Sequence, residues 1–365
     1  MRHYGGGSVE IVYPRGRNEK LCGSFWHTRY LGWSVMRTCL LIVRSSLPLP
    51  GSQTGNLGLI VILFLLAHIP LAAWAGQSRV QQLQHQYKEL RELAKVGPFG
   101  VPLRIHSDET GDQVSAEVYG IIEHPFETVR EALRSPASWC EFAPLHINVK
   151  ACTFQSRSDG TSLTLYVGRK YYQAPEAASP QSYLFSVQAD DSDYLSVALS
   201  ASQGIFGTST HKLQLEATGV EDKTVVALRS SYVPSTLTRL ATSIYLATAG
   251  RNKVGFSLED GATDGRPRRV KGFRGLIERN VMRYYLAFEA FLDFQSIPLP
   301  DRLEACLNAV YDMLEQYPTQ LHEIEKAEFL DTKRREHENQ LRLQRQLDTA
   351  STRSASPAQN PWSHA

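Results

Sequence analysis

The chain has 365 residues, a formal net charge of +2 and 42% hydrophobic residues. This length leaves room for more than one domain, while the balanced charge argues against general nucleic-acid binding or an acidic substrate. The slight basicity belongs to residues 1–75, which hold seven of the 39 Lys and Arg but only two of the 37 Asp and Glu.

An apolar segment near the N-terminus indicates export. Leu57–Ala67 is an uninterrupted apolar run, and Ala73-Trp74-Ala75 has the small-x-small form of a signal-peptidase site. Arg37 and Arg44 precede the run without an intervening acidic residue. Because positive charge lies on the N-terminal side, we expect the folded part to lie outside the cytoplasm.

Two interpretations of this segment stay open, ahead of a cytosolic fate. In the first, Met36 starts a signal peptide that is cleaved near Ala75, residues 1–35 are not translated, and the protein is periplasmic or secreted. In the second, Leu57–Ala75 is an uncleaved membrane anchor, since its length is close to that needed to span a bilayer.

Residues 76–112 are expected to form a helical linker. Apolar side chains from Val80 to Val96 recur at helical spacing, and Gly97-Pro98 ends the pattern. Residues 99–112 are expected as a loop or a short strand.

The most informative stretch runs from Val114 to Pro144. Its first part alternates apolar and polar residues, which indicates a half-buried strand. Pro125 then ends the strand and suits the first turn of a helix, and Ser135-Pro136 breaks that helix before Trp139 and Phe142. The order is therefore strand, short helix, break, and a second short helix that carries aromatic side chains.

This order resembles the opening of the START-like superfamily, also called SRPBCC, which includes lipid-transfer domains, polyketide cyclases and the birch-pollen allergen group. The resemblance covers roughly Val114 to Phe294. It implies an α+β helix-grip fold, in which a curved antiparallel sheet surrounds a long C-terminal helix and leaves a cavity between them. The motif supports the fold better than any activity.

The rest of the chain fits this expectation. Six strand candidates are separated by polar turns, which favours an antiparallel meander: Ile147–Phe154, Ser162–Val167, Tyr183–Val187, Leu195–Leu199, His211–Ala217 and Thr224–Tyr232. A helix over Ser235–Ala249 follows. Leu276–Phe294 has the broadest apolar stripe in the chain and takes the place of the long helix.

The expected domains follow from these elements. Residues 1–75 form an N-terminal extension with a signal peptide or anchor, 76–112 a helical linker, and 113–296 the START-like domain. Residues 297–347 form C-terminal helices, with helices predicted over Arg302–Glu315 and Pro318–Leu347, and residues 348–365 a disordered tail.

The candidate ligand-binding residues are those that could line such a cavity, and a filled core without a cavity is the alternative. They are Trp139, Phe142, Tyr166, Phe185, Arg229, Tyr232, Tyr284, Tyr285 and Phe288. Alternation from Val225 puts Arg229 on an otherwise apolar face, where it needs a carboxylate or ligand partner, and Glu278 and Glu289 are conceivable partners. The alternative is that a bulge exposes Arg229.

Other polar residues are given structural roles. Arg279 and Arg283 share a helix face and are most simply a solvated stripe. His124, His146 and His211 have no neighbour at a spacing that suggests a catalytic triad.

The apolar residues of the helix predicted over Ser235–Ala249 are expected to be buried, either beneath a lid that turns basic residues to a membrane surface or in extra packing on the sheet. They are Leu237, Leu240, Ile244 and Leu246.

No phosphate loop, dinucleotide fingerprint or zinc spacing is present, so no cofactor, metal site or catalytic residue is assigned. Cys140 and Cys152 flank the entry into the second strand and either form a disulfide or remain buried thiols.

The leading hypothesis is an exported protein that binds a hydrophobic small molecule or lipid, with a membrane surface as a candidate partner and no nucleic acid. The alternatives are a cyclase-like or dehydratase-like enzyme that uses the same cavity, and a non-enzymatic scaffold in which the charged C-terminal helix binds a partner. An enzyme would need an ionisable group that faces inward.

Overall fold

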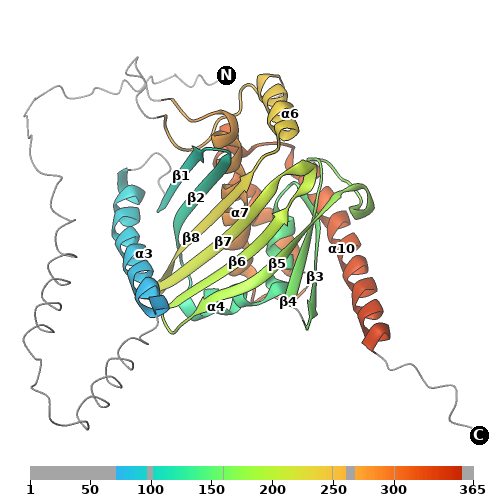
Figure 1. The fold of residues 1–365 in the computed structure, drawn as a ribbon, viewed down its shortest axis with the longest axis horizontal. Helices are drawn as coiled ribbons and strands as arrows, with labels where there is room; N and C mark the ends of the chain where they lie inside the picture. The colour runs from blue at the N-terminus through green and yellow to red at the C-terminus, as the bar shows by residue number, and fades with distance from the viewer. Residues whose placement is uncertain are drawn as a thin grey trace, which may run out of the picture. The chain divides into compact units, whose positions relative to one another are not determined.

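The computed structural model describes residues 71–96, 102–158, 160–248, 250–259, 268–299 and 301–355. Within them, one sheet packs against a long helix, α7, and further helices surround both (Figure 1). The apolar run Leu57–Ala67 lies outside the described residues. None of the described helices is long and apolar enough to cross a bilayer.

The sheet has eight antiparallel strands in the order β1-β2-β8-β7-β6-β5-β4-β3, which confirms the predicted meander. The strands are β1 Leu103–Thr110, β2 Gln113–Ile122, β3 Val149–Arg157, β4 Gly160–Val167, β5 Ser179–Asp190, β6 Tyr194–Gln203, β7 Ser209–Val220 and β8 Lys223–Val233. β1 pairs with β2 over its whole length, so the sheet begins inside the expected linker.

The helices are α3 Leu71–Val96, α4 Phe126–Arg134, α5 Pro136–Phe142, α6 Thr236–Ala247, α7 Gly272–Phe294, α8 Asp301–Glu315, α9 Pro318–Leu321 and α10 Lys326–Ala355. The described residues also contain three 3-10 turns: η1 Ala143–Leu145 after α5, η2 Pro175–Ala177 between β4 and β5, and η3 Ile205–Gly207 between β6 and β7. The two short helices predicted after β2 are confirmed. Ser135 ends α4 and caps α5, since its side chain accepts a hydrogen bond from the Ser138 amide.

The C-terminal region differs from its prediction in two ways. The helix expected over Pro318–Leu347 is two helices, because the chain is not helical over residues 322–325. The second of them, α10, continues to Ala355, beyond the expected start of the disordered tail.

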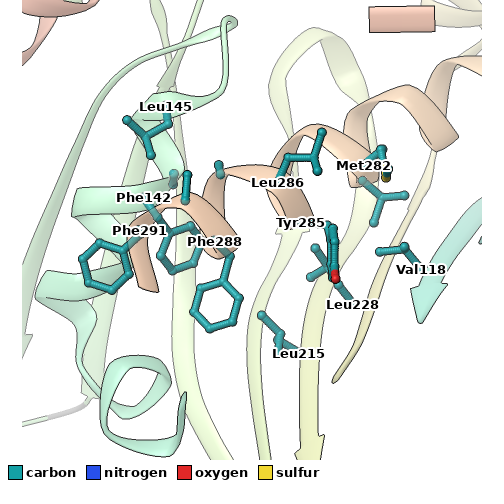
Figure 2. Packing of buried hydrophobic residues seen from close by; sticks show 14 of the residues in the cluster. Val118, Phe142, Leu145, Leu215, Leu228, Met282, Tyr285, Leu286, Phe288 and Phe291 are labelled. Atoms are coloured by element: carbon teal, nitrogen blue, oxygen red, sulfur yellow. The ribbon is translucent and has the colours of Figure 1, made fainter. Parts of the chain in front are cut away.

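The inner face of the sheet, which faces α7, carries the main hydrophobic core. Strand residues alternate across the sheet, so Val118, Leu215 and Leu228 point to α7 while their neighbours point away. Figure 2 shows these side chains beside Tyr285 and Met282 of α7, with Phe142, Phe288 and Phe291 packed farther along the helix. The sheet therefore grips α7, as the resemblance implied.

Close approach of α7 to β2 depends on one glycine. A Cβ atom added to Gly120 would overlap the hydroxyl and ring of Tyr285. Only glycine leaves space for this ring against the strand backbone. The position of α7 on the sheet is thus fixed in part by a residue without a side chain.

The outer face of the sheet is covered in part by α3. Val80, Leu83 and Leu90 of this helix are buried against outward-facing residues such as Val225 and Ala227. A polar group lies at the edge of this contact and is here called the α3 network: Arg79, Glu117, Tyr194, Glu216 and Arg229. Arg79 donates to Glu216 at 2.6 and 3.0 Å and to Glu117 at 3.2 Å.

Helix α10 covers the edge strand β3. The side chain of Gln340 accepts from the Cys152 amide at 2.7 Å, and Gln344 both accepts from and donates to the backbone of Phe154 at 3.0 Å. These bonds satisfy edge groups that would otherwise be free to pair with another chain. The C-terminal helix is thus part of the fold.

A buried charged group completes this contact, and it is here called the edge seam: Lys150, Lys333 and Glu336. Both lysine Nζ atoms lie 2.8 Å from the Glu336 carboxylate, and the three side chains are at most 3% exposed. Each lysine also donates to two backbone carbonyls at 2.9–3.0 Å. The polar atoms of the edge seam are therefore well satisfied.

Cys140 and Cys152 form a disulfide, with their Cα atoms 4.9 Å apart. This resolves the alternative between a disulfide and two buried thiols. The bond ties α5 to the edge strand β3, so it fixes the aromatic-bearing helix against the sheet. Cys306 is free and buried.

Candidate functional site

The predicted ligand-binding residues fall into three groups. The first contains Trp139, Phe142, Phe185 and Phe288, which are 1–9% exposed and contact one another in tilted and edge-to-face arrangements. The rings of Trp139 and Phe142 are 5.0 Å apart, and those of Phe142 and Phe288 are 5.1 Å apart. With Tyr285, which is held against Gly120, these side chains fill the core at this end of α7.

The second group points away from α7. Tyr166 lies between Leu165 and Val167, which pack in the inner core, so its side chain is on the outer face. Arg229 shares the outer face with Val225 and Ala227, as the alternation predicted. Its partner is Glu117 on the neighbouring strand, at 2.8 Å, and the expected pairing with Glu278 or Glu289 is wrong.

The third group contains Tyr232 and Tyr284, and the structure adds two residues to it. We call Tyr183, His211, Tyr232 and Tyr284 the aromatic cluster. The imidazole of His211 stacks on the Tyr232 ring at 5.4 Å and meets the edge of Tyr183 at 6.3 Å. All three tyrosines pack against the inner core and are half-buried, so they lie between the sheet and α7.

The hydroxyls of the aromatic cluster lack protein partners. Among the described residues, no hydrogen-bond partner is present for the hydroxyl of Tyr183, Tyr232 or Tyr284. Burial raises the pKa of Tyr183 and of Tyr232 to about 12, and it raises the pKa of Tyr284 as well. The three phenols are therefore neutral at ordinary pH, and their hydroxyls are free to donate to a ligand or to water.

His211 is positioned by a glycine. Its Nε2 lies 2.7 Å from the hydroxyl of Thr208, and a Cβ atom on Gly204 would overlap both groups. Burial lowers the pKa of His211. The imidazole is thus a fixed, mainly neutral wall of the cluster.

His146 adjoins the aromatic cluster. Its ring stacks on Tyr284 at 4.6 Å and is 4% exposed. Burial and the nearby cations Arg283, Lys333 and Lys150 lower its pKa well below the usual value. Nδ1 accepts a hydrogen bond from the Asn148 amide at 3.1 Å, so the neutral ring carries its proton on Nε2. Within the described chain, that buried Nε2 has no hydrogen-bond partner.

Arg279 and Arg283 are buried, so the prediction of a solvated stripe is wrong. They are 2% and 4% exposed, because the face of α7 that carries them is covered by the segments around Val254 and Leu321. Arg283 Nη2 donates to Glu323 at 2.7 Å. Burial lowers the pKa of Arg283 to about 10.

Glu323 is shared by three cations. Besides Arg283, Lys170 lies 2.5 Å and Lys253 3.4 Å from its carboxylate. Burial alone would raise the pKa of Glu323, but the three cations lower it. We call Lys170, Lys253, Arg279, Arg283 and Glu323 the cation cluster, which has more positive than negative charge.

Two carboxylates of α7 have different environments. Glu278 is fully buried and accepts hydrogen bonds from Ser107, from Ser257 and from the Phe256 amide. Glu289 is half-buried, and burial together with Asp293 and Glu123 raises its pKa to about 7. Glu278 therefore fixes the loop over α7.

An apolar pocket of about 170 Å³ lies elsewhere, among α5, α8, α10 and β3. The Cys140–Cys152 disulfide, Phe291 and Leu341 line it. This volume suits a group the size of a small aromatic ring and falls below the usual range for a drug-sized ligand.

Helix α6 does not have the expected orientation. Leu237, Leu240 and Ile244 are 56–70% exposed, so the prediction that they are buried, in a lid or in extra packing, is wrong. Phe206 of η3, the 3-10 turn in contact with α6, is 70% exposed. The helix is held through Arg239, which pairs with Glu109 at 2.7 Å.

Sequence reasoning missed Tyr183, His146 and Arg283. The sequence did contain a signal for Tyr183, because it lies two residues before Phe185 on a predicted strand and therefore on the same face. His146 and Arg283 offered no such signal, because their burial depends on α10 and on the segment around Leu321. Among the described residues, no group of three or more His, Cys, Asp or Glu could hold a metal ion.

No protein-family model and no curated protein matches the sequence. A solved fragment of a STAR-related lipid transfer protein from Xanthomonas axonopodis is 9% identical, covers 52% of this chain and 93% of its own, and has a TM-score of 0.33. Zhui aromatase/cyclase from Streptomyces sp. R1128 is 13% identical over 55% of this chain and 94% of its own, with a TM-score of 0.28. Truncated norcoclaurine synthase from Thalictrum flavum is 11% identical over 38% and 87%, with a TM-score of 0.26.

Proposed function

We propose that this helix-grip chain binds a hydrophobic small molecule or lipid between the inner face of the sheet and α7, at the aromatic cluster. The observation that carries the proposal is the set of three half-buried phenol hydroxyls without a partner among the described residues. A ligand with an apolar body and a few oxygen atoms would pack on the rings and accept hydrogen bonds from the hydroxyls.

A binding role is favoured over chemistry by the state of the residues first considered for a reaction. Arg229 points to the outer face and pairs with Glu117, while Glu278 is saturated by hydrogen bonds. The two histidines in or beside the aromatic cluster, His146 and His211, are not paired with a carboxylate among the described contacts. Glu289, whose pKa is raised to about 7 by burial, is influenced instead by Asp293 and Glu123. We therefore assign no chemical step.

The experiment starts with the purified full chain, analysed by native mass spectrometry before and after extraction with organic solvent. We expect a copurified apolar ligand, or binding of an apolar fluorescent probe by the extracted protein. Tyr232→Trp should reduce that binding because it removes a phenol hydroxyl and enlarges the ring that stacks on His211. Tyr166→Trp is the matched control, since its side chain lies on the outer face. Absence of both ligand and probe binding, or an equal effect of the two variants, overturns the proposal.

We also propose that the folded part works outside the cytoplasm. The disulfide between Cys140 and Cys152 supports this, because disulfides persist mainly in oxidising compartments. The apolar run before α3 supports it as well. N-terminal sequencing of protein from its native compartment, together with thiol labelling, tests both points. A fully labelled protein that retains residues 1–75 inside the cytoplasm would contradict the proposal.

A further inference from the structure

The cation cluster and His146 lie next to the aromatic cluster. Arg283 directly precedes Tyr284 on α7, and it is near enough to His146 to lower the pKa of that imidazole. His146 in turn stacks on Tyr284 at 4.6 Å. The buried guanidinium and the aromatic rings thus form one continuous region of the molecule.

Two buried donors in this region are unpaired among the described residues. Arg283 Nε has no hydrogen-bond partner, although Nη2 of the same group is bonded to Glu323 and to the Leu321 carbonyl. His146 Nε2 has none either, and it carries the proton because Nδ1 is an acceptor. A buried donor without a partner is costly, so both nitrogens call for acceptor atoms.

The charge of the region favours an anion as the source of those acceptors. Among the residues that the structure describes, Lys170, Lys253 and Arg283 share Glu323 as their one carboxylate, and the Arg279 side chain donates only to the carbonyls of Val254 and Gly275. Excess positive charge away from water is unfavourable unless a counter-charge is near. The side chain of Lys170 is 36% exposed, which gives the region a side open to solvent.

We infer that the ligand is an amphipath whose anionic end group, a carboxylate or a phosphate, accepts hydrogen bonds from Arg283 Nε and His146 Nε2. This inference rests on the proposed function, because the apolar part of the same molecule would occupy the aromatic cluster. The anionic end group would then balance the positive charge of the cation cluster that Glu323 alone does not neutralise. An arginine suits it, since a guanidinium can bond a protein carboxylate and a second oxyanion at once.

The test compares three probes that share one alkyl chain: palmitate, hexadecyl phosphate and hexadecanol. Their dissociation constants are measured by isothermal titration calorimetry on the solvent-extracted full chain. We expect at least one anion to bind about tenfold or more tightly than hexadecanol, since hydrogen bonds to charged groups are worth that much. The tighter of the two anions identifies carboxylate or phosphate.

Arg283→Met should abolish this preference by weakening the binding of the two anions to about the level of hexadecanol. Glu323 keeps Lys170 as a partner at 2.5 Å, so the substitution does not leave a carboxylate without a counter-charge. Arg229→Met, on the outer face, is the matched control and should keep the preference. If Arg283→Met does not fold, Arg283→Lys keeps the charge but lacks Nε, and it should reduce the preference about threefold or more.

The outcomes separate the two proposals. Failure of the wild-type chain to bind any probe overturns the proposed function and this inference with it. Equal binding of all three probes, or a preference that survives both Arg283 substitutions, overturns the anion site and leaves hydrophobic binding intact.

Discussion

Two buried polar regions of this protein face each other across His146, and they differ in how well their groups are satisfied. In the edge seam, Lys150, Lys333 and Glu336 make ion pairs at 2.8 Å and further bonds to backbone carbonyls. In the region of the aromatic cluster, three phenol hydroxyls, His146 Nε2 and Arg283 Nε lack partners among the described residues. Within the described chain, both regions contain buried basic side chains, but only the edge seam pairs each of them with a carboxylate.

The contrast between paired and unpaired polar groups indicates where to look for function in a fold without a catalytic motif. Buried polar groups are normally paired, so a paired region is explained by stability alone. The α3 network is a second example, since Arg79, Glu117 and Glu216 satisfy one another. An unpaired region needs another explanation, and a ligand supplies one.

The largest effect should come from the edge seam. Glu336→Ala leaves Lys150 and Lys333 buried without a carboxylate, so we expect a loss of about 3–5 kcal/mol in the free energy of unfolding. Urea denaturation followed by circular dichroism measures it. Glu338→Ala, an exposed position on the same helix, should change stability by less than about 0.5 kcal/mol. Similar effects at the two positions would remove the basis for calling the edge seam a structural unit.

The disulfide is the next largest contribution. Replacing Cys140 and Cys152 together by Ser opens a link with a sequence separation of 12, and we expect a loss of about 2–4 kcal/mol. Reductant should destabilise the wild type by a similar amount and leave the double variant unchanged. If reductant acts equally on both proteins, Cys140 and Cys152 are not linked in solution.

Glu289 is a carboxyl group on α7 whose ionisation is disfavoured in the folded protein. Its folded pKa is about 7 against an ordinary value of 4.5, so the native state binds more protons between these pH values. Stability should therefore fall as pH rises from about 4.5 to 7. Glu289→Gln should remove this slope and be more stable at pH 8 by roughly 1–2 kcal/mol, allowing for its partial exposure.

Thermal unfolding of Glu289→Gln and the wild type from pH 4 to pH 8 provides the measurement. Glu131→Gln, an exposed position on α4, is the control and should keep the slope of the wild type. An unchanged slope in Glu289→Gln would show that other groups set the pH dependence.

The smallest effect compares two tyrosine hydroxyls directly. Tyr194 donates to Glu216 in the α3 network, so Tyr194→Phe should cost about 1 kcal/mol. The Tyr284 hydroxyl has no partner among the described residues, so Tyr284→Phe should leave stability within about 0.5 kcal/mol and weaken ligand binding. Equal destabilisation by the two variants would mean that the Tyr284 hydroxyl is satisfied in solution.

Local sequence patterns were enough to predict the secondary-structure elements and their order. Alternation along Val114–Ile122, the break at Ser135-Pro136 and the apolar stripe of Leu276–Phe294 predicted a strand, two short helices and the long helix, and the structure confirms each of them. Alternation also predicted that Arg229 shares a face with Val225 and Ala227, but not that this face is the outer one. These features depend on backbone periodicity and proline geometry, which are properties of neighbouring residues.

The tertiary structure alone decided which polar groups are buried and whether they are paired. Arg283 and Lys333 look like surface residues in the sequence, and they are buried because segments more than 35 residues away cover them. Tyr166 and Tyr232 look equally suitable as ligand contacts, yet the pleat of the sheet sends them to opposite faces. Burial and pairing depend on contacts between distant segments, and no local pattern in the chain specifies them.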